Sequence, residues 1–75
     1  MELYPCSQKA IEVGNFPLNH DCILKVDYIG GSPIRFAYFT CRSQDSGFLA
    51  DVILKLSVVK RVNIVSVEEF NMQYL

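Results

Sequence analysis

Apolar and polar residues alternate in two neighbouring segments, 22–29 and 34–41, which flank a Gly-Gly-Ser-Pro sequence. Alternating β-branched and aromatic residues bounded by Gly and Pro are typical of a β-hairpin. A two-residue loop at Gly31-Ser32 suits a type II′ turn, which needs Gly at its first central position. This turn predicts that Cys22 pairs with Cys41, whereas a turn centred one residue earlier would exchange the partners.

The predicted hairpin has two faces, because directly opposed residues of paired strands point to the same side. The face that we expect to pack into the core carries Cys22, Leu24, Val26, Tyr28, Arg35, Ala37, Phe39 and Cys41. The second face is also unusually apolar, since it includes Ile23, Ile29, Ile34, Phe36 and Tyr38. This second face is therefore either an interface or a surface that another part of the chain covers.

The next segment has the apolar spacing of a helix from about Gly47 to Val58, preceded by N-cap candidates between Ser43 and Ser46. The arc expected to pack on the sheet contains Phe48, Leu49, Val52, Ile53, Leu56 and Val59. Leu54 and Val58 lie in a second stripe on the far side of this helix. They offer a second apolar position for contact with a partner.

Two further segments complete the expected order of elements. The β-branched run from Arg61 to Glu68 predicts a strand. Near the N-terminus, Ser7 is placed to cap a short helix over Gln8–Val13, although the N-terminal segment also fits the edge of a strand. A short strand at Glu2–Tyr4 would give the order βαββαβ, that of the ferredoxin-like fold, and without it the order is ββαβ. Both alternatives are α+β, with one main helix packed on one face of a small antiparallel or mixed sheet.

Residues 45–69, DSGFLADVILKLSVVKRVNIVSVEE, resemble the first half of an ACT-type regulatory domain. Matching positions are Asp45, Gly47, Leu49, Ala50, Asp51, Val52, Asn63, Ile64, Ser66 and Val67. Ser46 stands where the family usually has Pro, and two strands and a second helix would follow in that family. The resemblance implies a ferredoxin-like dimer that senses a small molecule such as an amino acid. The ligand site that the resemblance implies is a loop over residues 45–49, and its residues are Asp45, Ser46, Gly47, Phe48 and Leu49.

Size and charge narrow the classes of function. The chain of 75 residues predicts one domain over residues 1–75. Its net charge of −1 disfavours a strong electrostatic nucleic-acid binder. Binding of single-stranded nucleic acid remains an alternative function. Charged and aromatic side chains alternate at Arg35, Phe36, Tyr38 and Phe39, and basic side chains cluster near the end of the helix at Lys55, Lys60 and Arg61.

The apolar runs are too short to span a membrane and the first residues do not resemble a signal peptide, so we expect a cytoplasmic location.

The candidate chemistry of the chain is sparse. One combination of side chains that could hold zinc is Cys6, His20, Cys22 and Cys41. However, the sequence has none of the closely spaced cysteine pairs that structural zinc sites use. A disulfide between Cys22 and Cys41 fits the hairpin register, although an odd number of cysteines, 3, favours a reducing compartment. The simplest interpretation is buried thiols. We therefore expect no enzyme, no cofactor and no metal.

Protein binding is the function class that the sequence favours most. The residues expected at the interface are Ile23, Ile29, Ile34, Phe36, Tyr38, Leu54 and Val58. They predict a small non-enzymatic protein that binds another protein, as an inhibitor or an adaptor, and that can form a homodimer. Accessory proteins of phages or mobile elements are of this type. The competing interpretation is that residues 1–20 and 70–75 fold over these positions as part of the core.

Overall fold

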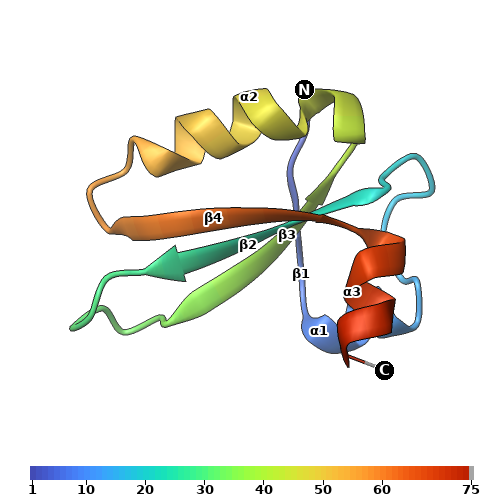
Figure 1. Ribbon diagram of the computed structural model, residues 1–75, viewed down its shortest axis with the longest axis horizontal. Helices are drawn as coiled ribbons and strands as arrows, with labels where there is room; N and C mark the ends of the chain where they lie inside the picture. The colour runs from blue at the N-terminus through green and yellow to red at the C-terminus, as the bar shows by residue number, and fades with distance from the viewer. Residues whose placement is uncertain (75) are drawn as a thin grey trace.

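The protein folds as a four-stranded antiparallel sheet with helices on both faces, seen in a computed structural model that describes residues 1–74 (Figure 1). Its elements are β1 Tyr4–Cys6, α1 Gln8–Glu12, β2 Cys22–Tyr28, β3 Phe36–Cys41, α2 Ser43–Leu54, β4 Val59–Ser66 and α3 Val67–Tyr74. The strand order is β1-β3-β2-β4, and each neighbouring pair is antiparallel. The predicted α+β class is confirmed.

The strand order separates this sheet from the ferredoxin-like alternative. The first six elements do follow the order βαββαβ. However, β1 and β4 form the two opposite edges of the sheet, whereas a ferredoxin-like sheet places its first and last strands side by side. β3 and β4 run parallel with β2 between them, so α2 is the crossover that connects them.

The hairpin of β2 and β3 has the predicted register. Cys22 pairs with Cys41, and Asp27 pairs with Phe36. Six of the eight residues of the expected core face belong to the core that α2 covers, and they are Cys22, Leu24, Val26, Tyr28, Phe39 and Cys41. The expectation for Arg35 is corrected, because this residue is exposed in the loop before β3. The prediction derived this register from a two-residue turn at Gly31-Ser32. Burial of one face also specifies it, because a shift of one residue would move every apolar side chain to the other face.

The turn of the hairpin differs from the prediction. The N–H of Ser32 donates to the carbonyl of Ile29 at 3.3 Å, and Gly31 has a φ of +92°. These values place Gly30-Gly31 at the centre of the turn and Gly31 at the position where a type II turn needs positive φ. The register is kept because residues 29–35 form a longer loop instead of a two-residue turn.

The main core lies between the sheet and α2. It consists of Cys22, Leu24, Val26, Cys41, Leu49, Ile53 and Val59. Half of the predicted helical arc is not part of it, because Phe48, Val52 and Leu56 are 45–56% exposed. A single helix rests on the sheet along a narrow line, so only the centre of the arc, at Leu49 and Ile53, is buried against β2 and β4.

A second core lies on the opposite face of the sheet, where we had expected exposed side chains. Ile11 of α1 and Phe70 of α3 pack there against Ile23 and Tyr38. The Phe70 side chain is 1% exposed, and its ring meets the Tyr38 ring edge-on with 5.6 Å between centroids. The expectation that helices cover only one face of the sheet is therefore corrected. At Ile23 and Tyr38 the alternative applies, in which the two ends of the chain fold over the second face of the hairpin. Leu75, the last residue of the expected covering segment, lies outside the described residues.

Candidate protein-binding surface

The structure divides the predicted interface residues into a buried and an exposed group. Ile23 and Tyr38 are 0% and 6% exposed, so the expectation that they are accessible is corrected. The others remain 45–56% exposed, and these are Ile29, Ile34, Phe36, Leu54 and Val58. A role in binding remains a prediction for this second group.

Most of the exposed group gathers at one end of the molecule. The loop between β2 and β3 and the connection between α2 and β4 lie at the same end (Figure 1). The N–H of Ile29 in the first segment donates to the carbonyl of Val58 in the second, at 2.9 Å. We give the name tip surface to the exposed apolar residues of these two segments together with the last residue of α2; they are Ile29, Ile34, Leu54, Leu56 and Val58.

A shallow apolar pocket of about 190 Å³ opens in the tip surface. Its lining residues are Tyr28, Ser32, Pro33, Ile34 and Val58. The pocket thus joins side chains from the hairpin loop and from the α2–β4 connection. A pocket of this size fits one apolar side chain of a partner, which is how anchor residues of protein interfaces are held.

Local backbone structure explains why the connection after α2 exposes its apolar side chains. The N–H of Leu56 donates to the carbonyl of Ile53 at 3.0 Å, and the N–H of Val59 donates to the carbonyl of Leu56 at 3.1 Å. Two tight turns therefore follow the helix directly. Val59 is turned into the core, whereas Leu56 is 56% exposed and Val58 46%. Sequence reasoning missed Leu56, because it assigned this residue to the packed side of the helix.

Phe36 is exposed but is separate from the tip surface, because it lies on the face of the sheet that carries the second core. Its ring meets Tyr38 edge-on at 5.5 Å, and the Lys25 ammonium lies 5.0 Å from the centre of the Phe36 ring. The aromatic side chains proposed for stacking on single-stranded nucleic acid do not form one platform. Tyr38 is covered by Phe70, and Phe39 points to the opposite face, against the main core.

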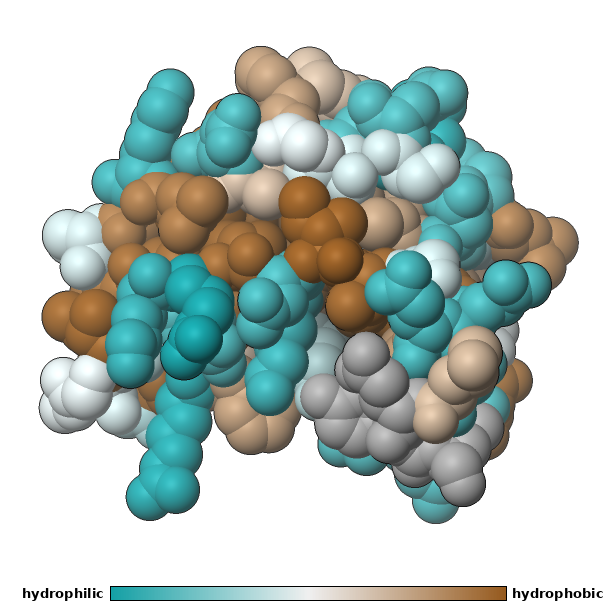
Figure 2. All heavy atoms as spheres, in the orientation of Figure 1, coloured by the Kyte–Doolittle hydropathy of each residue, from teal (hydrophilic) through white to brown (hydrophobic). Residues whose placement is uncertain are grey.

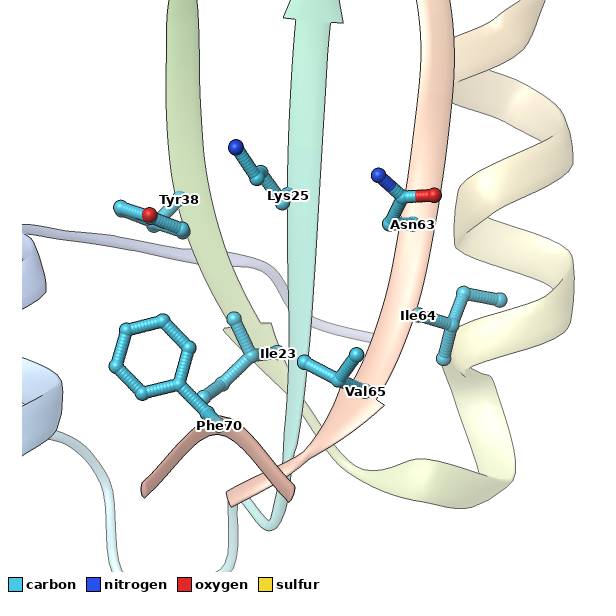
Figure 3. A pocket seen from close by; sticks show the side chains of 7 residues that line it. All are labelled: Ile23, Lys25, Tyr38, Asn63, Ile64, Val65 and Phe70. Atoms are coloured by element: carbon cyan, nitrogen blue, oxygen red, sulfur yellow. The ribbon is translucent and has the colours of Figure 1, made fainter. Parts of the chain in front are cut away.

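A deeper pocket of about 290 Å³ lies beside β4, on the face that α3 partly covers (Figure 3). Its lining residues are Ile23, Lys25, Tyr38, Asn63, Ile64, Val65 and Phe70. Figure 3 shows the polar groups of Lys25 and Asn63 at one side and apolar groups at the other. The sequence held no signal for this pocket, because its wall at Phe70 depends on where α3 begins.

The positions implied by the ACT resemblance are helical, not a loop. Asp45 to Leu49 form the first turns of α2. The Asp45 carboxylate accepts hydrogen bonds from the Arg42 guanidinium at 3.1 and 3.2 Å, and Leu49 is in the main core. These side chains therefore have structural partners. The relationship to the ACT family itself remains a prediction.

The buried thiols and the histidine have no arrangement suited to metal binding. Within residues 1–74, no three side chains of His, Cys, Asp or Glu are grouped to hold a metal ion. Cys22 and Cys41 are free thiols, and burial raises the pKa of both, for Cys41 to about 11. Nδ1 of His20 lies 2.9 Å from the hydroxyl of Thr40, in the protein interior. The thiols are therefore protonated at neutral pH and unsuited to nucleophilic attack.

Comparison of the chain with protein-family models, with curated proteins and with solved structures gave no match. In the part of the chain that the structure describes, no helix has the length and apolar character needed to cross a membrane.

Proposed function

We propose that the protein acts by binding another protein through the tip surface, as an inhibitor or an adaptor in the cytoplasm. The observation that carries the proposal is the meeting of Ile29, Ile34 and Val58, from two distant segments, at one end of the fold. Contiguous exposed apolar groups of this kind mark interaction sites more often than scattered ones do.

The energetics favour contact with a partner at this surface. Each of the tip-surface side chains keeps about half of its area in water, between 45% and 56%. Burial of apolar area is worth roughly 25 cal/mol per Å², so covering several such side chains together supplies useful binding energy. The pocket beside Ile34 and Val58 provides a place for one anchoring side chain.

Chemical crosslinking in lysate, followed by isolation of the partner, provides the material for a quantitative test. Calorimetric titration then compares the wild-type protein with Ile34→Asp and Val58→Asp. We expect each substitution to weaken binding by about 30-fold or more, because truncation of an anchor costs about 2 kcal/mol or more.

Leu18→Asp is the matched control, since Leu18 is fully exposed in the loop before β2. It introduces the same charge and should leave the affinity unchanged. Equal losses for Leu18→Asp and Ile34→Asp, or wild-type affinity in both tip variants, would overturn the proposal. Circular dichroism confirms that each variant is folded.

A further inference from the structure

The edge strand β4 is the longest strand of the sheet, and one of its two sides is open. It has 8 residues, whereas β1 at the opposite edge has 3. Within residues 1–74, β4 pairs only with β2. Long open edges are templates for pairing with another strand, and proteins usually block them with charge or with irregular backbone.

The direction of the backbone groups in β4 follows from its neighbour. The N–H of Tyr28 donates to the carbonyl of Arg35 at 2.9 Å, which directs the backbone groups of Tyr28 toward β3. The direction alternates along a strand, so the preceding odd-numbered residues point the other way, toward β4. These residues are Ile23, Lys25 and Asp27, and their partners in β4 are Val65, Asn63 and Arg61.

The intervening residues of β4 therefore direct their N–H and C=O groups away from the sheet. They are Val62, Ile64 and Ser66. A second hydrogen bond supports this alternation of inward- and outward-directed backbone groups. The N–H of Val67 donates to the carbonyl of Asp21, which continues the ladder between β2 and β4. Near Lys60 the ladder is irregular, since the pairing shifts between Asp27 and Tyr28. The regular part of the open edge is thus centred on Ile64.

Charge along β4 favours one orientation for an added strand. Lys60 and Arg61 lie at its beginning, and Glu68 and Glu69 follow its end, in the first turn of α3. Two copies of β4 in antiparallel orientation bring the basic beginning of each strand beside the acidic residues that follow the other. Opposite charges across paired strands are favourable, and like charges are not.

The apolar surface along this edge is also suited to self-association. Ile64 is 45% exposed, and α2, which packs beside β4, carries Phe48 and Val52 at 56% and 45% exposure. Figure 2 shows hydrophobic side chains gathered between α2 and β4 on this side of the molecule. In Figure 3 the Ile64 side chain points toward α2, away from the pocket.

We propose that β4 pairs antiparallel with β4 of a second copy, with the two-fold axis at Ile64. Ile64 then faces its own counterpart and Val62 faces Ser66 of the other copy, so all the regular outward-directed groups form hydrogen bonds. The two sheets become one of eight strands, in the order 1-3-2-4-4-2-3-1. This interface is distinct from the tip surface, and the antiparallel arrangement places the two tip surfaces at opposite ends of the dimer.

Light scattering after size exclusion tests the dimer. The wild-type protein should have about twice the monomer mass of 8.5 kDa. Ile64→Pro removes an outward-directed N–H and leaves the ladder with β2 intact, so it should give a folded monomer. Ile64→Lys places like charges on the axis and should also give a monomer, while Leu18→Asp should remain a dimer. A monomeric wild-type protein, or dimers in both Ile64 variants, would overturn the proposal.

Disulfide crosslinking tests the register, in protein that carries Cys6→Ser. In the proposed register Asn63 of one copy faces Val65 of the other in a pair with Cα atoms about 4.5 Å apart, a spacing that a disulfide can bridge. A mixture of Asn63→Cys and Val65→Cys proteins should form a covalent dimer with oxidised glutathione. Each protein alone should not, because the two copies of one position are diagonal and farther apart. Crosslinking of Asn63→Cys alone, or none in the mixture, would overturn this register.

Discussion

The carboxylate of Asp21 accepts a hydrogen bond from the backbone N–H of Ser43 at 2.8 Å, and a second from the Ser43 hydroxyl at 3.1 Å. Ser43 is the first residue of α2, so a side chain from before β2 caps the helix that follows β3. The backbone hydrogen bond from Ser43 is the largest cause of a lowered pKa at Asp21. The ionised carboxylate therefore stabilises the native state.

We predict that Asp21→Asn lowers the unfolding temperature at neutral pH. A lowered native pKa contributes stability above the unfolded value of 3.8 and loses it as the pH falls below that value. The difference in unfolding temperature between wild type and variant should therefore shrink in acid. Thermal unfolding followed by circular dichroism over this pH range measures it. Asp51→Asn, at an exposed position of α2, is the control, and an equal effect there would contradict the capping role.

The sequence could not predict where α2 begins, because the group that caps this helix comes from a distant part of the chain. The prediction chose a cap among Ser43 to Ser46 and began the helix near Gly47, because local caps are the only ones that a sequence pattern reveals. The capping group in fact comes from Asp21, on another element. The beginning of the short helix α1, in contrast, was correct, since its cap is local: the N–H of Ala10 donates to the hydroxyl of Ser7.

Phe70→Ala should be among the most destabilising substitutions in the chain. The side chain is 1% exposed and closes the second core over Tyr38, so its removal leaves a cavity. Replacement of a buried Phe by Ala costs about 3–5 kcal/mol of unfolding free energy. Urea denaturation measures this quantity. Met72→Ala on the same helix is the control at 85% exposure, and its effect should stay within about 0.5 kcal/mol.

The covering of the second face shows what alternation along the sequence cannot predict. The hairpin register was correct although the turn from which it was derived was not, and the alternation of apolar residues does not reveal which segment covers a face. The β-branched run from Arg61 to Glu68 predicted a strand over that whole segment, whereas the strand ends at Ser66 and α3 begins at Val67. Likewise, Ile34 and Val58 were both expected to be exposed, but their meeting in one pocket depends on the lengths of the elements between them.

Two neighbouring residues of α2 should respond very differently to truncation. Leu49 is 8% exposed in the main core, whereas Phe48 is 56% exposed, although both lay in the predicted arc. Leu49→Ala should cost about 2–5 kcal/mol of unfolding free energy. Phe48→Ala should cost well under half as much in monomeric protein, for which Ile64→Pro is a suitable background. A larger loss at Phe48 would indicate that the helix packs on the predicted arc instead.

Alkaline pH should weaken the fold through the buried thiol of Cys41. Burial is the largest cause that raises its pKa, from 9.0 to about 11. Between these two values the unfolded chain releases a proton that the native state retains, so the free energy of unfolding falls as the pH rises from 9.0 toward 11. Cys41→Ala removes this contribution and should make the decline shallower, as measured by urea denaturation at a series of pH values. Part of the decline should remain, because burial also raises the pKa of the Cys6 and Cys22 thiols. Met72→Ala removes no titrating group and should keep the wild-type slope. A slope in Cys41→Ala as steep as that of the wild type would show that the Cys41 proton is not linked to folding.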